Sequence, residues 1–159
     1  MKKNKTLKIL GVIVLLIVLH LWEYSLCARK LYAYSYETLS QQLRVATSYY
    51  LRNGQEDIGE LENNLLELDV AVSYRVFSMF PNRTHLLYEK FDSVTRQLVM
   101  RTLMPEDIPY FYDVLNKISI EVSHLVTSYQ VNNISEAQYD KITKLLDELL
   151  EITTKVEIE

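Results

Sequence analysis

The sequence predicts an all-α protein, in which an N-terminal transmembrane helix is followed by an up-down antiparallel helical bundle of four to five helices. Three observations support this prediction. A predominantly apolar run over residues 9–21 directly follows four lysines. Apolar residues then recur every three or four positions, which is the period of amphipathic helices. Only three glycines and three prolines occur in 159 residues, so the chain has little turn material for a sheet.

The predicted transmembrane anchor covers residues 7–28, behind a basic head at residues 1–6. A helix over 7–28 is about 33 Å long, enough to cross the roughly 30 Å hydrocarbon layer. Lys8, Trp22 and Tyr24 are expected at the membrane interfaces, where lysines snorkel and aromatic rings lie among headgroups. Positive charge is greater before the apolar run than after it. We therefore expect a single-pass protein of the plasma membrane, with a cytoplasmic N-terminus and residues 29–159 outside the cytoplasm.

Two other fates of this segment remain open. A signal peptide would be cleaved after Ala28, and a lipoprotein would be cleaved before Cys27 and lipidated there. Leu26 and Tyr24 are large residues at positions where those cleavage sites prefer small ones. Retention as an anchor is therefore the leading interpretation.

The composition excludes several classes of function. Residues 29–159 carry 13 of the 17 Lys and Arg residues and 20 of the 21 Asp and Glu residues, a net charge near −7. Such an acidic surface argues against nucleic acid as a partner. The single cysteine cannot form an internal disulfide. Because no phosphate-binding, nucleophilic, dinucleotide-binding or zinc-protease motif occurs, we expect neither an enzyme nor a cofactor.

The first bundle helix is expected to end at Asn53-Gly54. No helix breaker lies between Trp22 and Leu51, so the membrane helix can continue unbroken into it. Its apolar stripe is formed by Leu31, Leu39, Leu43, Ala46 and Tyr50. Tyr32, Tyr34 and Tyr36 suit either an extended aromatic belt at the membrane or packing on this helix.

The next three helices follow from periodicity and from residues that start or stop helices. The second is expected from Ile58 to Met79, ending at Pro81. The third has Thr84 as its predicted N-cap and a stripe formed by Leu87, Phe91, Val94 and Leu98. The fourth begins near Pro105, and its stripe is formed by Ile108, Phe111, Leu115, Ile118, Val122, Leu125 and Tyr129.

The fifth helix has the clearest start. Ser135 and Gln138 have the spacing of a capping box, and Ile134 and Tyr139 that of a hydrophobic staple. The broad apolar face of this helix is the candidate contact region for a partner protein; it consists of Leu145, Leu146, Leu149, Leu150 and Ile152. The alternative is that this face is buried inside its own bundle.

Two arginines are candidate ligand-binding residues. Arg75 and Arg101 occur where a strict heptad requires an apolar residue, and in a cleft they would bind an acidic ligand. Alternatively, because an ideal helix drifts by about 20° per heptad, the apolar stripe has moved to Val76 and Thr102.

Two pairs have the spacing of metal ligands on a helix. They are His85 with Glu89, and Glu121 with His124. Both histidines lie two positions from a predicted core residue, so we expect them to point towards solvent. No metal site is therefore predicted.

The sequence Met-Phe-Pro-Asn-Arg-Thr at residues 79–84 resembles the N-terminal helical region of YpeB-type spore-germination proteins. The leading functional hypothesis is a binding or scaffolding module for another cell-envelope protein, with homo-oligomerisation possible. The first alternative is a sensor-like bundle that binds a small ligand and signals through a partner, similar in layout to bacterial chemoreceptor ectodomains. The second, implied by the resemblance, is an exported protein of spore or envelope assembly.

Overall fold

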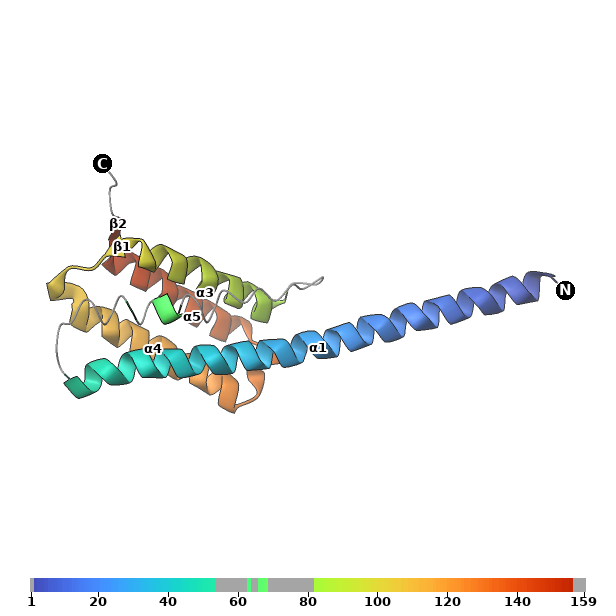
Figure 1. Ribbon diagram of the computed structural model, residues 1–159, viewed down its shortest axis with the longest axis horizontal. Coiled ribbons are helices and arrows are strands. Elements are labelled where there is room, and N and C mark those ends of the chain that lie inside the picture. The colour runs from blue at the N-terminus through green and yellow to red at the C-terminus, as the bar shows by residue number, and fades with distance from the viewer. Residues whose placement is uncertain (1, 54–62, 64–65, 69–81, 156–159) are drawn as a thin grey trace.

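The computed structural model describes residues 2–53, 63, 66–68 and 82–155, and the fold is all-helical, as predicted (Figure 1). The long helices are α1 (Lys2–Asn53), α3 (Arg83–Val99), α4 (Ile108–Thr127) and α5 (Glu136–Ile152). Short 3-10 turns, η1 (Pro105–Asp107) and η2 (Gln130–Asn132), precede α4 and α5. Two-residue strands β1 (Arg101–Thr102) and β2 (Thr154–Lys155) pair antiparallel near the chain's C-terminal end.

Helix α1 is continuous for 52 residues and ends at Asn53, so the predicted fusion of the apolar segment with the first bundle helix is confirmed. Its N-terminal half projects away from the bundle (Figure 1). The described side chains from Leu10 to Leu26 are all exposed. Among the described residues, α1 is the helix that is long enough and apolar enough to cross a membrane, and its mean hydropathy there is 2.0. It fits a membrane anchor or a signal sequence.

The other helices pack beside the C-terminal half of α1. Helix α4 contacts α1 and α5, and α3 contacts α5. The consecutive helices α3, α4 and α5 alternate in direction (Figure 1). Consequently α3 and α5 run parallel where they touch, as two ion pairs show: Arg83 with Glu136, and Lys90 with Asp147.

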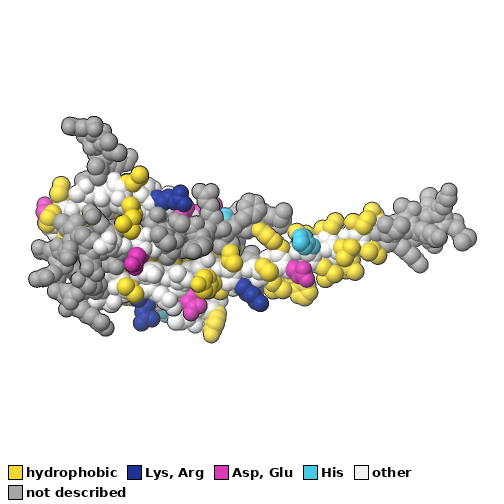
Figure 2. Space-filling view, in the orientation of Figure 1, with side chains coloured by type: hydrophobic (Ala, Val, Ile, Leu, Met, Phe, Trp, Pro, Cys, Tyr) yellow, Lys and Arg dark blue, Asp and Glu magenta, His cyan; other side chains and the backbone are white. Residues whose placement is uncertain are grey.

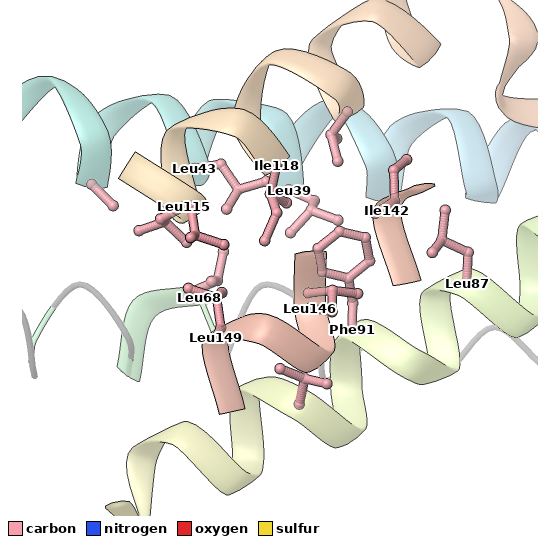
Figure 3. Packing of buried hydrophobic residues seen from close by; sticks show 14 of the residues in the cluster. Leu39, Leu43, Leu68, Leu87, Phe91, Leu115, Ile118, Ile142, Leu146 and Leu149 are labelled. Atoms are coloured by element: carbon pink, nitrogen blue, oxygen red, sulfur yellow. The ribbon is translucent and has the colours of Figure 1, made fainter. Parts of the chain in front are cut away.

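The core lies between these helices and contains most of the predicted apolar stripes (Figure 3). Leu39 and Leu43 of α1 pack towards residues of α4 and α5, whereas Leu31 is half exposed. Most of the predicted second helix lies outside the described residues. Residues 66–68 lie within that predicted helix and are helical, and Leu68 is buried in the core.

The predicted capping box of α5 is confirmed. The Gln138 backbone N–H donates to Ser135 Oγ at 3.3 Å, and the Ser135 N–H donates to Gln138 Oε1 at 3.1 Å. Ile134 is buried and Tyr139 packs partly buried against the same core. Local sequence therefore specifies this helix start, since both bonds join residues three positions apart.

The predicted N-cap of α3 is wrong. Asn82 is the N-cap, and its Oδ1 accepts a hydrogen bond of 3.0 Å from the His85 N–H. Thr84 is buried two residues further on, in the first turn of α3, where its hydroxyl donates to the Val131 carbonyl at 2.5 Å. Asn and Thr are both good N-caps. The choice between them depends on η2, which provides a distant acceptor for the threonine.

Tyr129 does not continue the stripe of α4. The helix ends at Thr127, and Tyr129 has a left-handed backbone with φ 57° and a side chain that is 90% exposed. Among the tyrosines after the apolar segment, Tyr32 and Tyr36 are buried, while Tyr34 is exposed. Packing on the bundle is thus the role of Tyr32 and Tyr36.

Candidate functional site

The five candidate contact residues on α5 differ in exposure. Leu146 and Leu149 are fully buried in the core of the protein itself. Leu145, Leu150 and Ile152 are partly buried against the same core. Only these three reach the surface, so the face as a whole cannot contact a partner while the bundle stays folded.

Arg101 contacts the end of α5. Its Nη1 donates to the Leu150 carbonyl and lies 3.4 Å from both the carbonyl oxygen and Oγ1 of Thr153. Carbonyls in the last turn of a helix lack partners within the helix. This half-buried arginine gives the Leu150 carbonyl a charged donor, and the Thr153 hydroxyl donates to the same carbonyl at 3.3 Å. Arg75, the other candidate ligand residue, lies outside the described residues.

We expect Arg101→Gln to lower the free energy of unfolding by about 1–3 kcal/mol, because it removes a charged donor to a helix-end carbonyl. The measurement is chemical unfolding of the full-length chain in detergent. Arg96→Gln is the control, since the partner of Arg96 among the described residues is Asp92, one turn away on the same helix. Such an i,i+4 surface pair usually contributes less than about 1 kcal/mol. Equal stability of the two variants would contradict this role.

The expected membrane-interface residues all lie in α1. Trp22 is 63% exposed and Tyr24 is 38% exposed. Lys8 is part of the helix, but its side chain lies outside the described set. Both aromatic side chains thus reach the surface on the projecting part of α1.

His85 is not turned towards solvent, which corrects the prediction from its position. Its Nδ1 lies 2.6 Å from the Tyr32 hydroxyl of α1, and its Nε2 lies 3.2 Å from Glu89 Oε1. The first turn of α3 packs against α1 as well as α5, so a position off the main apolar stripe still faces a helix. Tyr36 adds a second link, donating to the Thr84 carbonyl at 3.0 Å. Together these bonds tie α3 to the helix that carries the apolar segment.

His124 is exposed, as predicted, and Glu121 pairs with Lys141 at 2.6 Å. Among the described residues, no group of three or more His, Cys, Asp or Glu side chains is arranged to hold a metal ion. The turn at residues 79–84 is described only from Asn82, where α3 begins.

Tyr88 of α3 is buried beside Tyr36, with ring centroids 5.8 Å apart. Burial raises the pKa of its hydroxyl, and a hydrogen bond with Ser35 opposes this shift. The neutral phenol is therefore favoured in the folded state. The corresponding stabilisation is complete below pH 10, the usual tyrosine pKa, and is lost as the pH rises through the higher pKa of the folded state.

We expect the denaturant midpoint of the full-length chain to fall between pH 9 and about pH 11. The fall should be smaller in Tyr88→Phe, which has no hydroxyl to ionise. Tyr34→Phe serves as the control because Tyr34 is exposed. If Tyr88→Phe loses as much stability as the unmodified chain, ionisation of Tyr88 does not contribute.

An open groove runs along the seam between α1 and α4, with a volume of about 440 Å³. Small hydroxyl residues form much of the seam, and the Ser40 and Ser123 hydroxyls hydrogen-bond across it at 2.9 Å. The groove is lined by Arg44, Thr47, Ser48, Asn116, Ser119, Ile120, Ser123, His124 and Thr127. Short side chains leave the hollow, whereas exposed Ile120 adds an apolar surface to it.

Arg44 is the charged residue that α1 contributes to the groove. It is exposed and forms no ion pair with any described carboxylate. Periodicity did not single it out, because a polar residue between core positions is typical of any amphipathic helix. A hydroxyl-lined hollow with one cation can hold an anion or the polar rim of a protein contact.

A second hollow, of about 480 Å³, lies between the start of α4 and the outer face of α5. Two of the carboxylates that line it have partners: Glu148 accepts from the Tyr110 hydroxyl, and Asp147 binds Lys90. We take the α1–α4 groove as the candidate site, since its cation, Arg44, has no such internal partner among the described residues.

Comparison with known proteins finds no family model that matches this chain, and no curated protein or solved structure similar to it.

Proposed function

We propose that this protein is a single-pass membrane protein whose helical bundle lies outside the cytoplasm and binds another protein of the cell envelope. The observation that supports this most directly is the division of α1. Every described side chain from Leu10 to Leu26 is exposed, whereas Leu39 and Leu43 of the same helix are buried in the bundle core. A long exposed apolar stretch is stable in lipid rather than in water.

The continuity of α1 has a mechanical consequence. No break separates the apolar segment from the bundle, so the bundle cannot swivel freely on a flexible linker. Hydrogen bonds from Tyr32 and Tyr36 fix α3 to the same helix. A partner bound to the bundle would therefore be held at a defined height and orientation above the membrane.

The α1–α4 groove is the surface proposed for the contact. Ile120 lies in the groove and is 55% exposed. Polar residues surround Ile120, an arrangement typical of interfaces, in which an apolar centre has a polar rim. The partly buried residues on α5 offer less accessible apolar surface.

Co-purification of the full-length protein from its native membranes tests this assignment. We expect Ile120→Asp to lose the envelope partner while keeping its unfolding midpoint. Met100→Asp is the matched control, because Met100 is 75% exposed at the end of α3. Leu150→Asp tests the α5 face in the same experiment. A partner retained by Ile120→Asp would exclude the groove, and the absence of any partner would contradict the binding function.

The proposed orientation is tested by fusing a reporter to the C-terminus of the full chain. A reporter active outside the cytoplasm supports the orientation. Activity in the cytosol would overturn both the localisation and the envelope partner.

Arg44 favours a second candidate function, a sensor that binds a small anion in the same groove. A ligand that binds only the folded state stabilises it by about 2.7 kcal/mol at 100 times its dissociation constant. A panel of small carboxylates and inorganic phosphate should then raise the unfolding temperature of the full-length chain, but not that of Arg44→Gln. No shift with any panel member would count against the sensor.

A further inference from the structure

We propose that the end of the bundle nearest the apolar segment lies in the lipid headgroup layer, with Leu31, Tyr34, Leu86 and Tyr129 as its contact residues. We call this set the headgroup patch. The proposal rests on the proposed function, because it requires the apolar segment to remain in a bilayer.

The height of this end follows from contacts with α1. Tyr32 reaches His85, Tyr36 reaches the Thr84 carbonyl, and Thr84 reaches the Val131 carbonyl. The first turn of α3 and the turn η2 are therefore level with residues 32–36 of α1. At 1.5 Å per residue, this level is roughly 6–12 Å beyond Ala28. A headgroup layer is roughly 5–8 Å thick on each side, so the edge of this level that faces the membrane falls within the headgroups.

Large side chains are exposed at this level. Tyr34 is 71% exposed, Leu31 51%, Leu86 42% and Tyr129 90%. Helical side chains lean towards the N-terminus of their helix, and both α1 and α3 have their N-terminal ends on the membrane side. Leu31, Tyr34 and Leu86 therefore lean towards the lipid. Hydrophobic side chains predominate on the described part of the projecting helix, with histidine, acidic and basic side chains among them nearer the bundle (Figure 2).

Tyr129 provides an independent observation. It is the one described non-glycine residue with a positive φ, at a position after a helix where glycine or asparagine is usual. Its backbone N–H donates to the Val126 carbonyl at 3.2 Å. Because this bond joins backbone atoms, it does not require a tyrosine side chain at this position. No core packing explains a tyrosine that is 90% exposed. An amphipathic ring at headgroup depth does, because tyrosine is enriched at membrane interfaces.

The charges at this end suit a layer of lipid phosphates. Arg29 and Lys30 are exposed on α1 just before the patch, and Glu37 is exposed just after it. Arg83 and Glu136, in the first turns of α3 and α5, neutralise each other at 3.0 Å. The patch therefore presents aromatic and aliphatic groups together with two cations on its lipid side.

The test uses the full-length chain in phosphatidylcholine vesicles, with an environment-sensitive fluorophore on single cysteines. Tyr129→Cys and Leu86→Cys are made in a Cys27→Ser background, and Met100→Cys at the other end of α3 is the control. Native Cys27, which is exposed, reports the anchor. We expect probes at 27, 86 and 129 to shift to the blue and to be quenched by spin-labelled lipids, unlike the probe at 100.

Two other results are decisive. Quenching at 27 combined with water-like emission at both 86 and 129 would overturn the headgroup patch and leave the anchor intact. Water-like emission at all positions, including 27, would overturn the membrane anchor and the proposed function with it. In a second measurement, Tyr129→Gly should fold at least as stably as the unmodified chain, since glycine accepts the positive φ. A loss of stability in this variant would assign Tyr129 a structural role and contradict the proposal.

Discussion

Replacing Leu149 with aspartate is expected to unfold the bundle. Leu149 is 1% exposed and packs in the core near Leu68 (Figure 3). The substitution removes a buried apolar side chain and places a carboxylate where the described core offers no cation. Such a change costs about 5 kcal/mol or more, comparable with the whole stability of a typical domain. The measurement is thermal unfolding and limited proteolysis of the full-length protein in detergent.

The adjacent substitution Leu150→Asp is the matched control. Leu150 is only partly buried, so its carboxylate can reach water, and the variant should remain folded with a modest loss of stability. A Leu149→Asp protein that melts like the unmodified chain would show that α5 does not pack as described. The pair also guides binding experiments: loss of a partner on changing Leu146 or Leu149 reports unfolding, whereas loss on changing Leu150 reports a surface contact.

The second large effect is expected at Ile118 of α4. Ile118→Ala should lower the free energy of unfolding by about 2–5 kcal/mol, because Ile118 is completely buried and its truncation leaves a cavity. Ile120→Ala, two residues later on the same helix, should change it by no more than about 0.5 kcal/mol, since Ile120 is 55% exposed. Chemical unfolding of the full-length chain measures both.

Because the two residues are of one type and lie on one helix, differences in helix propensity cancel. Equal effects of the two substitutions would contradict the assignment of the core face of α4. A stable Ile120→Ala protein would also show that the groove can be altered without disturbing the fold, which the binding experiments require.

The sequence was most informative about structural features that depend on nearby residues. The spacing of Leu115, Ile118 and Val122 correctly predicts the buried face of α4, because helical geometry alone determines which positions share a face. Ser135 and Gln138 predict the start of α5 because both capping bonds are local. The absence of a helix breaker after Trp22 correctly allows α1 to remain unbroken.

Predictions failed wherever a distant helix supplies the partner. His85 faces α1 because Tyr32 lies opposite it, 53 positions earlier in the chain. Thr84 is an internal donor to Val131 rather than an N-cap. Arg101 bonds to the end of α5 across a similar separation. None of these contacts has a local signal, since each depends on how the helices are arranged in space.

The same distinction applies to the candidate site. Periodicity identified α5 as strongly apolar, but it could not show that Leu146 and Leu149 are enclosed by neighbouring helices. Nor could it identify the groove containing Arg44, which exists only because short side chains of α1 and α4 meet at one seam. Helical periodicity shows on which face of a helix a residue lies, whereas the function of that residue depends on which other parts of the protein pack against that face.

The amino-acid order alone determined the helical class, the apolar N-terminal segment, the helix faces and the start of α5. These features follow from contacts within about four residues. The packing of the chain determined which faces became buried, which charged groups found partners and which end of the bundle adjoins the apolar segment. These properties depend on pairs of residues tens of positions apart, and no local pattern encodes such pairs.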